Sequence, residues 1–301
     1  MRITFPIFHF VASSLHLCFF NHIVYNEKTK ARSKTNHFMK NLRGDLIKFD
    51  LTKIEFSNND EKRGVTLPSE PNTKLAELIG ILIGDGHVAY YPKCHNYDIE
   101  ISGHSDHDYS YHKDHINYLI KDLFNITPKF FIWKTRNEMR SRILSKAIFN
   151  FMKMMEFPGG RKGNMPVSAW IMKDGEYMRS FLRGLADTDF SLVFKRRSNG
   201  KYSYPVIKGS IKNRNVIGSV EKILKVLKIK YCVCYDENKY DKRSERNQTI
   251  HSIYIYGKKN LELWMKLVGF NNKKHLNKYI EWKNNGFVVV SKGRNGGPEG
   301  I

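Results

Sequence analysis

The chain has 301 residues, 41% of them hydrophobic, and a formal net charge of +22 with a sequence pI near 9.7. This length and apolar content indicate a globular protein with one large core or two smaller ones. Four scattered cysteines, Cys18, Cys94, Cys232 and Cys234, exclude a disulfide framework and favour a reducing compartment. The excess charge indicates a polyanionic partner.

The basic residues are concentrated in the second part of the chain. Residues 191–301 carry 24 basic and 8 acidic side chains, against 27 and 21 in residues 1–190. They lie in strand-like stretches rather than along an amphipathic helix, which favours nucleic acid over an anionic membrane surface. We expect no membrane partner.

The first 24 residues are apolar but are interrupted by His9, His16 and His22. They resemble a weak signal peptide, yet they are short for a membrane span and no clean cleavage site follows. We expect residues 1–38 to be a non-essential or disordered extension, with Met39 as an alternative start, and residues 39–71 to be a lead-in segment. The Gly-rich residues 289–301 predict a disordered tail. An intracellular protein, in the cytoplasm or an organellar matrix and not secreted, is expected.

The next residues predict a regular order of elements. An apolar helix over residues 75–86 precedes strands at 87–91 and 97–102, and residues 112–124 predict a helix with one buried face. Strands at 129–135 and 140–144 and a helix at 146–155 follow. The order is helix, two strands, helix, two strands, helix.

The second half repeats this order. A helix at 176–188, strands at 191–197 and 202–211, a helix around residues 217–227, and strands at 230–235 and 249–256 are expected. The stretch from Leu144 to Lys162 matches that from Tyr256 to Lys274 at a constant offset of 112. We therefore predict an α+β fold made of two αββαββα repeats, at residues 72–170 and 171–288.

The first helix of each repeat ends in an aspartate with a glycine five residues earlier. Gly80 precedes Asp85, and Gly184 precedes Asp189. A glycine within a helix is destabilising by about 1 kcal/mol relative to alanine, and close approach of two helices is a good reason to keep it. Two such helices packed together would bring their terminal aspartates side by side, where a divalent metal would relieve the repulsion.

The paired motifs, with the element order around them, resemble the single-chain, two-repeat LAGLIDADG homing endonucleases. The signature helix of that family matches residues 78–86 and 182–190, and the similarity in element order covers roughly residues 72–285. The resemblance implies a pseudo-symmetric fold in which two central signature helices join saddle-shaped antiparallel sheets that face DNA. It implies a sequence-specific, metal-dependent endonuclease that hydrolyses phosphodiesters on both strands across the minor groove.

The resemblance also implies roles for particular residues. Asp85 and Asp189 would hold Mg²⁺, for which Mn²⁺ can substitute, assisted by the carbonyls of Gly84 and Thr188. Double-stranded DNA is the expected partner of a monomer, with structured RNA of a host intron as a second partner. Such hydrolysis requires neutralisation of the charge that grows on the phosphate. A carboxylate is also disfavoured at the negative end of a helix dipole, so two of them argue for a cation.

Three features depart from the family pattern. The closing glycine is Gly86 in the first repeat but Phe190 in the second, which predicts a turn without positive-φ freedom or with strain. Asp187 in the second helix corresponds to Ile83 in the first. The lysine that the family places near each site aligns with Lys212 in the second repeat and with His104 in the first, where the alternatives are a phosphate contact and an exposed loop residue.

Charged residues in the strands are candidates for reading DNA. Such side chains can reach phosphates and guanine edges, although a charged strand face is often only solvated. The candidates are Lys134, Arg136, Arg140, Arg142, Lys195, Arg197 and Lys208. His104, His107, His112 and His115 have near-ligand spacing for zinc, but solvated loop histidines are the preferred interpretation.

Two other classes of function stay open. One is a catalytically inactive nucleic-acid binder on the same fold, such as an RNA splicing maturase or a DNA-binding regulator. The other is a basic interaction protein that binds without sequence preference and with steep salt dependence. The two retained aspartates argue against the last one.

Overall fold

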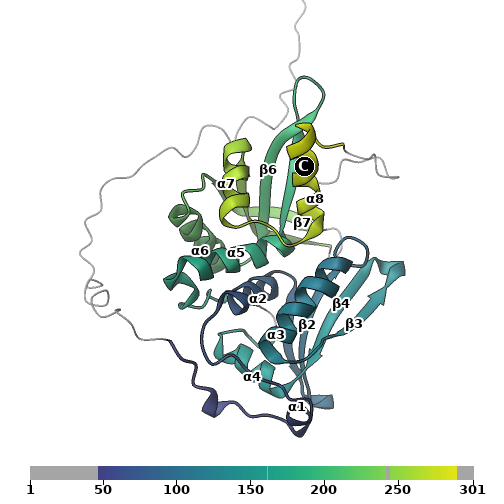
Figure 1. Cartoon of the computed structure of the whole chain (residues 1–301), viewed down its shortest axis with the longest axis vertical. Coiled ribbons are helices and arrows are strands. Elements are labelled where there is room, and N and C mark those ends of the chain that lie inside the picture. Colours follow the sequence, from purple (N-terminus) through teal and green to yellow (C-terminus); the bar gives the residue numbers. More distant parts are fainter. Residues whose placement is uncertain (1–46, 161, 242–244, 290–301) are drawn as a thin grey trace, which may run out of the picture. The chain divides into compact units, whose positions relative to one another are not determined.

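The computed structural model describes residues 47–160, 162–241 and 245–289, so the expected extension at 1–38 and all but Val289 of the expected tail lie outside it. Figure 1 shows the elements of the first repeat and labels all of them except β1. They are α2 (Thr73–Gly84), β1 (Gly86–Tyr91), β2 (Asn96–His104), α3 (Asn117–Phe124), β3 (Lys129–Trp133), β4 (Glu138–Leu144) and α4 (Lys146–Met154). A π-helical turn, Tyr111–Ile116, leads directly into α3.

The second repeat follows the same order. Its elements are α5 (Gly175–Asp189), β5 (Phe190–Arg196), β6 (Tyr202–Ile211), α6 (Arg214–Val226), β7 (Cys232–Asp241), β8 (Arg246–Tyr256) and α7 (Lys258–Leu267). A final helix, α8 (Lys273–Asn285), was not predicted separately. The hairpin of β7 and β8 is longer than expected, since β7 continues past residue 235 and β8 begins before residue 249.

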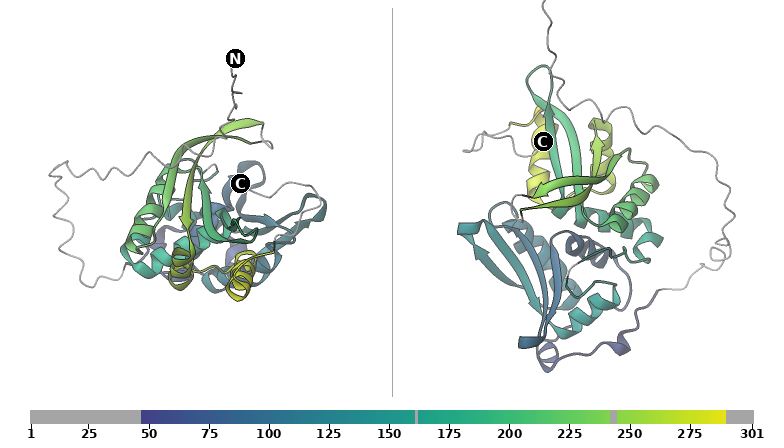
Figure 2. Two further views of the ribbon diagram at one scale, coloured as in Figure 1. Left: turned by 90° about the horizontal axis from the view of Figure 1, so that it is seen from above. Right: turned by 180° about the vertical axis from the view of Figure 1, so that it is seen from behind.

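Each repeat forms one four-stranded antiparallel sheet. The strand orders are β1-β2-β4-β3 and β5-β6-β8-β7, which are equivalent when the second repeat is numbered like the first. Buried and partly exposed residues alternate along β4, as in a sheet with one face in the core. Seen from behind, the strands of both sheets lie in front of the helices (Figure 2). The predicted α+β fold class is confirmed.

The start of each sheet shows how the two repeats diverged without losing their backbone plan. Gly86 pairs with Ile101 in the first sheet, and Phe190 pairs with Gly209 at the equivalent place in the second. A Cβ on Gly86 would lie 2.4 Å from the Cα of Leu82, and a Cβ on Gly209 would lie 2.4 Å from the Phe190 ring. The glycine of the pair therefore lies in the first strand of the first sheet but in the second strand of the second sheet.

Of the two alternatives for Phe190, the structure has the turn without positive φ rather than the strained one. Its backbone is extended, with φ −105° and ψ 161°, and it begins β5. Gly86 is not among the described glycines with positive φ either. The glycine in the first repeat is required for close approach to Leu82 rather than for a left-handed turn.

The described part of the lead-in segment is packed on the first repeat. It contains η1 (Leu51–Lys53) and α1 (Asn58–Lys62), and Ser57 and Asp60 form a capping box at the start of α1. The buried Asp60 carboxylate also accepts hydrogen bonds from the backbone amides of Lys146 and Ala147, at 3.1 and 3.2 Å. Asp60 thus stabilises the N-terminus of α4 as well as that of α1.

Helices α2 and α5 lie side by side between the two sheets (Figure 1). Their contact surface contains many apolar residues, and Leu75, Ile81, Leu182 and Leu185 are completely buried. This central pair belongs to one hydrophobic cluster that extends into both repeats. Among the described residues, no helix is both long and apolar enough to cross a membrane.

Candidate active site

Helices α2 and α5 touch at their glycines. A Cβ built on Gly80 would lie 2.2 Å from the carbonyl oxygen of Phe181, and one on Gly184 would lie 2.1 Å from the carbonyl oxygen of Glu77. A Cβ on Gly84 would lie 2.0 Å from the Thr188 hydroxyl oxygen. The backbones are therefore so close that no larger residue fits unless they move, and the C-terminal ends of both helices are held together.

Asp85 and Asp189 stand at these adjoining ends. Asp85 is the C-cap of α2, and Asp189 is the last residue of α5. Burial, followed by the charge of Asp85, raises the pKa of Asp189 to about 7. Burial also raises the pKa of Asp85, and Lys274 opposes that shift. The two partly buried carboxylates thus share one electrostatic environment, in which their repulsion favours a cation.

Lys162 supplies a positive charge at this place, and its role was missed in the sequence. Its ammonium group donates to the carbonyl oxygens of Ile83 and Gly84, at 2.7 and 2.5 Å. Burial lowers the pKa of Lys162, while the charges of Asp189 and Asp85 act in the opposite direction. Lys162 is half-buried in the loop after α4, far from both aspartates in sequence.

Lys274 is the counterpart of Lys162 at the offset of 112 residues. It lies in the first turn of α8 and forms an ion pair of 3.0 Å with the buried Asp108. Its charge lowers the pKa of both Asp85 and Asp189. The offset of 112 residues therefore pairs the two lysines in the sequence, although it predicted only the duplication and no role for either lysine.

Lys212 lies on the Asp189 side of the site. It follows β6, is exposed to solvent, and its charge lowers the pKa of Asp189. Because Ile101 and Gly209 occupy equivalent register positions, His104 is the counterpart of Lys212 in the first repeat. The ring of His104 instead accepts backbone hydrogen bonds from Asp106 and His107, at 3.2 and 3.4 Å. His104 thus organises its own loop.

His107 is an exposed loop residue, as expected, but His112 and His115 are not, so that interpretation is wrong for these two. His112 is buried and hydrogen-bonds Ser141 at 2.7 Å, and burial lowers its pKa to about 4. His115 hydrogen-bonds the buried Glu77 at 2.6 Å. Nowhere in the described chain do three or more His, Cys, Asp or Glu side chains form a metal-binding group.

Glu77 and Asp187 organise a buried polar network beside the helix pair. Glu77 pairs with Arg183 of α5 at 2.6 Å and accepts from the Asn271 side chain at 2.6 Å. Asp187, whose pKa burial raises to about 7, accepts from the backbone amides of Asn271 and Asn272, each at 3.0 Å. These bonds fix the segment that carries Lys274. Asp187 thus has a structural role that Ile83, its counterpart in the first repeat, cannot have, because an apolar side chain accepts no hydrogen bonds.

The donor set at the helix ends fits a hard divalent cation. Asp85 and Asp189 offer carboxylate oxygens, and helix C-termini leave backbone carbonyls such as those of Gly84 and Thr188 without intrahelical partners. Mg²⁺ is commonly bound by one or two carboxylates, with water and substrate phosphate completing the octahedron. The Gly84 carbonyl, however, accepts from Lys162 in this structure. The ammonium and a metal would compete for that oxygen.

The strand cations differ between the two sheets. In the first sheet, Arg140 pairs with Glu138 and Glu100 at 2.7 and 3.1 Å, and Arg142 pairs with Asp98 and Glu100. Lys134 and Arg136 lie in the turn between β3 and β4. The first sheet therefore neutralises its own arginines.

In and beside the second sheet, three of the candidate cations lie over tyrosine rings, whereas Lys239 of β7 pairs with Glu237. Lys195 lies 5.6 Å from the Tyr256 centroid, and Lys208 lies 5.8 Å from that of Tyr254. Arg197 lies 4.4 Å from the centroid of Tyr204. Burial lowers the pKa of Lys208, and the charge of Lys239 lowers it further. An anion against this sheet would relieve that repulsion.

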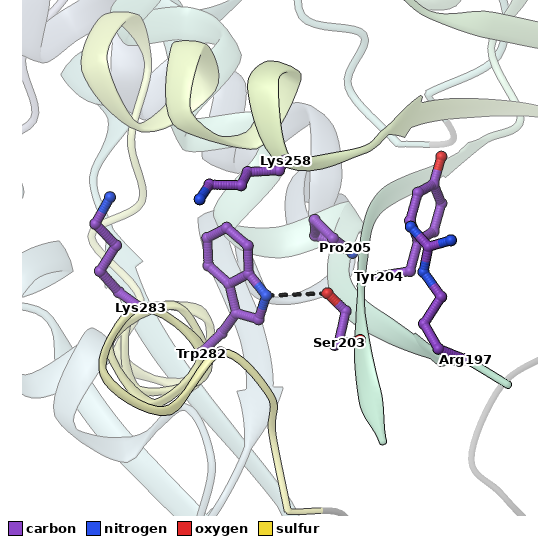
Figure 3. A pocket seen from close by; sticks show the side chains of 8 residues that line it. Arg197, Ser203, Tyr204, Pro205, Lys258, Trp282 and Lys283 are labelled. Carbon is purple, nitrogen blue, oxygen red and sulfur yellow. Dashed lines mark hydrogen bonds between the residues drawn. The ribbon is translucent and has the colours of Figure 1, made fainter. Parts of the chain in front are cut away.

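A hollow of about 350 Å³ lies at the far end of the second sheet (Figure 3). Arg197 and Tyr204 line one side, and the indole of Trp282 lies between Lys258 and Lys283 on the other. Trp282 donates to the carbonyl oxygen of Ser203 at 3.0 Å. Neither aspartate of the site borders this hollow.

Comparisons with known proteins give distant similarities. No family model matches the chain. An uncharacterized protein of Methanocaldococcus jannaschii is 29% identical over 178 residues, which are 56% of this chain and 60% of the relative, so the chain spans about three fifths of that relative's length.

Solved structures show similarity at the level of element arrangement. A variant of the homing endonuclease I-DmoI is 17% identical with a TM-score of 0.44, over 65% of this chain and 88% of the other. The LAGLIDADG homing endonuclease I-GzeII in complex with its DNA target is 12% identical with a TM-score of 0.45, over 72% and 90%. Full-length DUF199/WhiA of Thermotoga maritima is 16% identical with a TM-score of 0.43, over 80% and 66%. At this distance the similarities assign neither a family nor an activity to the chain.

Proposed function

We propose that this protein is a sequence-specific, divalent-metal-dependent double-strand DNA endonuclease of the LAGLIDADG homing endonuclease type. One observation carries the proposal. Two helices, whose glycines Gly80 and Gly184 each lie against the backbone of the other helix, end in partly buried aspartates. The charges of these aspartates, Asp85 and Asp189, act on each other and on Lys162. A structural role alone does not explain two carboxylates at the negative ends of adjacent helices.

The residues have complementary tasks in phosphodiester hydrolysis. Asp85 and Asp189, with the carbonyls of Gly84 and Thr188, would hold Mg²⁺, or Mn²⁺ in its place. When bound, the metal would neutralise the charge on the phosphate and assist departure of the leaving oxygen. Each helix end would serve one DNA strand, so that the pair cuts both.

Lysines around the aspartates complete the site. Lys162 and Lys274 place positive charge beside the carboxylates and so limit their repulsion. Lys212 is exposed on the Asp189 side, where it could orient a water molecule or contact a phosphate. His104, turned into its own loop, is assigned a positioning role there rather than a chemical one.

Duplex DNA is the proposed partner, and the uncovered sheet faces are its proposed binding surface. Lys195, Arg197 and Lys208 of the second sheet would contact phosphates, and the turn residues Lys134 and Arg136 would do the same beside the first sheet. Arg140 and Arg142 would contribute less charge because carboxylates already neutralise them. We propose a monomer that acts inside the cell.

A catalytically inactive nucleic-acid binder on the same scaffold is the second candidate. The hydrogen bond from Lys162 to the Gly84 carbonyl favours it, because the ammonium occupies an oxygen that the metal would use. A maturase would bind structured RNA, and a regulator would bind duplex DNA. Neither would need ionised Asp85 and Asp189.

Cleavage of a randomised duplex library tests the proposal. With Mg²⁺, sequencing should reveal double-strand ends at one recurrent sequence, and EDTA should abolish them. Asp85→Asn and Asp189→Asn should each reduce the rate at least about 100-fold, since metal-assisted charge stabilisation contributes several kcal/mol. Asp122→Asn is the matched control, because Asp122 forms only an exposed ion pair with Lys74. Uncut libraries with retained binding would instead support the inactive binder.

A further inference from the structure

Strand β3 exposes four large apolar side chains in succession. Phe130, Phe131, Ile132 and Trp133 are between 36% and 42% exposed, whereas the neighbouring strand β4 buries every second residue. β3 is the edge strand of the first sheet. Such a surface is disfavoured in water unless a partner uses it.

The register divides these side chains between the two faces of the sheet. Phe131 pairs with Arg140, and Trp133 pairs with Glu138. Opposed residues in a sheet point to the same side, so both rings lie on the uncovered face with Arg140. Phe130 and Ile132 lie on the other face.

Phe131 and Trp133 form an ordered pair rather than two isolated rings. Their planes are 17° apart and their centroids 6.0 Å apart. The Arg140 guanidinium lies 5.4 Å from the Trp133 centroid. Because Glu138 and Glu100 hold Arg140, the guanidinium is a fixed neighbour of the Trp133 ring.

The surroundings of the ring pair fit duplex DNA. Lys134 and Arg136 adjoin it in the turn after β3. Both are exposed, and the turn itself contains no carboxylate. Two cations at the end of an apolar patch complement a polyanion that also offers apolar groups. In the major groove, the apolar group on the base edges is the thymine 5-methyl.

We propose that Phe131 and Trp133 read thymine methyl groups in one half of the DNA site, whereas the second sheet supplies mainly phosphate contacts. This division rests on the proposed function and specifies its substrate. The division between the two sheets follows from the different charges on them. The first sheet pairs its arginines with carboxylates, and the second leaves Lys195 and Lys208 on tyrosine rings.

Replacement of thymine by uracil in a bound duplex removes only the methyl group. The full chain, in EDTA to prevent cleavage, would select duplexes from a randomised pool, and the preferred duplex would be resynthesised with uracil in either half. For the wild type we expect about fourfold weaker binding for each contacted methyl, in one half only. Trp133→Ala and Phe131→Ala should each lose part of the preference for thymine, and the double variant should bind the thymine and uracil duplexes equally.

Phe130→Ala is the matched control, since it truncates a similarly exposed ring on the opposite face of the same strand. It should retain the full preference for thymine. Thermal unfolding of each variant separates loss of recognition from loss of folding. Equal binding of thymine and uracil duplexes by the wild type would overturn the inference. So would preference for single strands, or a dimer that forms through β3.

The outcomes also separate this inference from the proposed function. Recurrent, Asp85-dependent cleavage at a site indifferent to uracil would overturn only the thymine contact. Failure to select any duplex would overturn the proposed function and the inference together.

Discussion

The glycine contact between α2 and α5 leads to a sharp prediction for Gly184→Ala. The new Cβ would lie 2.1 Å from the Glu77 carbonyl oxygen, whereas ordinary contacts begin at 3.4 Å. The helices must therefore separate by roughly 1 Å where they cross. Overpacking of this kind is destabilising by about 1–3 kcal/mol, and a backbone atom as the obstacle places the change at the upper end.

Alanine is also the better helix former, by about 1 kcal/mol. The net loss should therefore be about 2 kcal/mol, which corresponds to a fall in Tm of about 4–8 °C for a domain of this size. Gly218→Ala in α6 is the control, because nothing lies within 4 Å of the new Cβ. It should raise Tm by about 2–4 °C.

Urea unfolding and thermal melts of the two variants against the wild type would measure the difference. Gly80→Ala, with its Cβ 2.2 Å from the Phe181 carbonyl oxygen, should behave like Gly184→Ala. If both central substitutions stabilise the protein as Gly218→Ala does, the helices do not cross at the glycines and the reasoning fails.

Three further outcomes are expected. Arg183→Met should lower the free energy of unfolding by about 3 kcal/mol in urea titrations, because it leaves the buried Glu77 with weaker partners; an effect below about 1 kcal/mol would contradict this. In the folded, metal-free protein the pKa of Asp189 is about 7, whereas in the unfolded chain it is near 4. The contribution of this group to stability therefore falls as the pH rises from about 4 to about 7. Asp189→Asn should therefore gain stability relative to wild type from pH 5 to 8 in EDTA, and a pH-independent difference would refute it. Lys208→Ala should lower the salt slope of duplex binding by about 1, measured by titration at several salt concentrations, and an unchanged slope would exclude a phosphate contact.

The order of elements was readable in the sequence because apolar residues recur at helix and strand periods. The extension of the β7–β8 hairpin was not, since residues 236–248 are almost wholly polar and show no alternation. The π-helical turn before α3 gave no signal either. The glycine-aspartate spacing predicted the central helix pair because it reflects a local packing need that occurs twice.

The surroundings of the aspartates depend on contacts distant in sequence. Lys162 reaches α2 from a loop 78 positions away, and Lys274 reaches the site from α8. Neutralisation of Arg142 by Asp98 required the register of β2 against β4, which no local pattern reveals. Phe190 fits the second sheet because Gly209 lies opposite it, and no local motif reveals that pairing.

Anomalous scattering from Mn²⁺ in crystals of the protein with its selected duplex tests the central claim most directly. The account predicts metal peaks between the carboxylates of Asp85 and Asp189, next to the phosphates of the two strands, with the Lys162 ammonium moved from the Gly84 carbonyl. Peaks elsewhere, or an aspartate pair without metal and with Lys162 still in place, would contradict it.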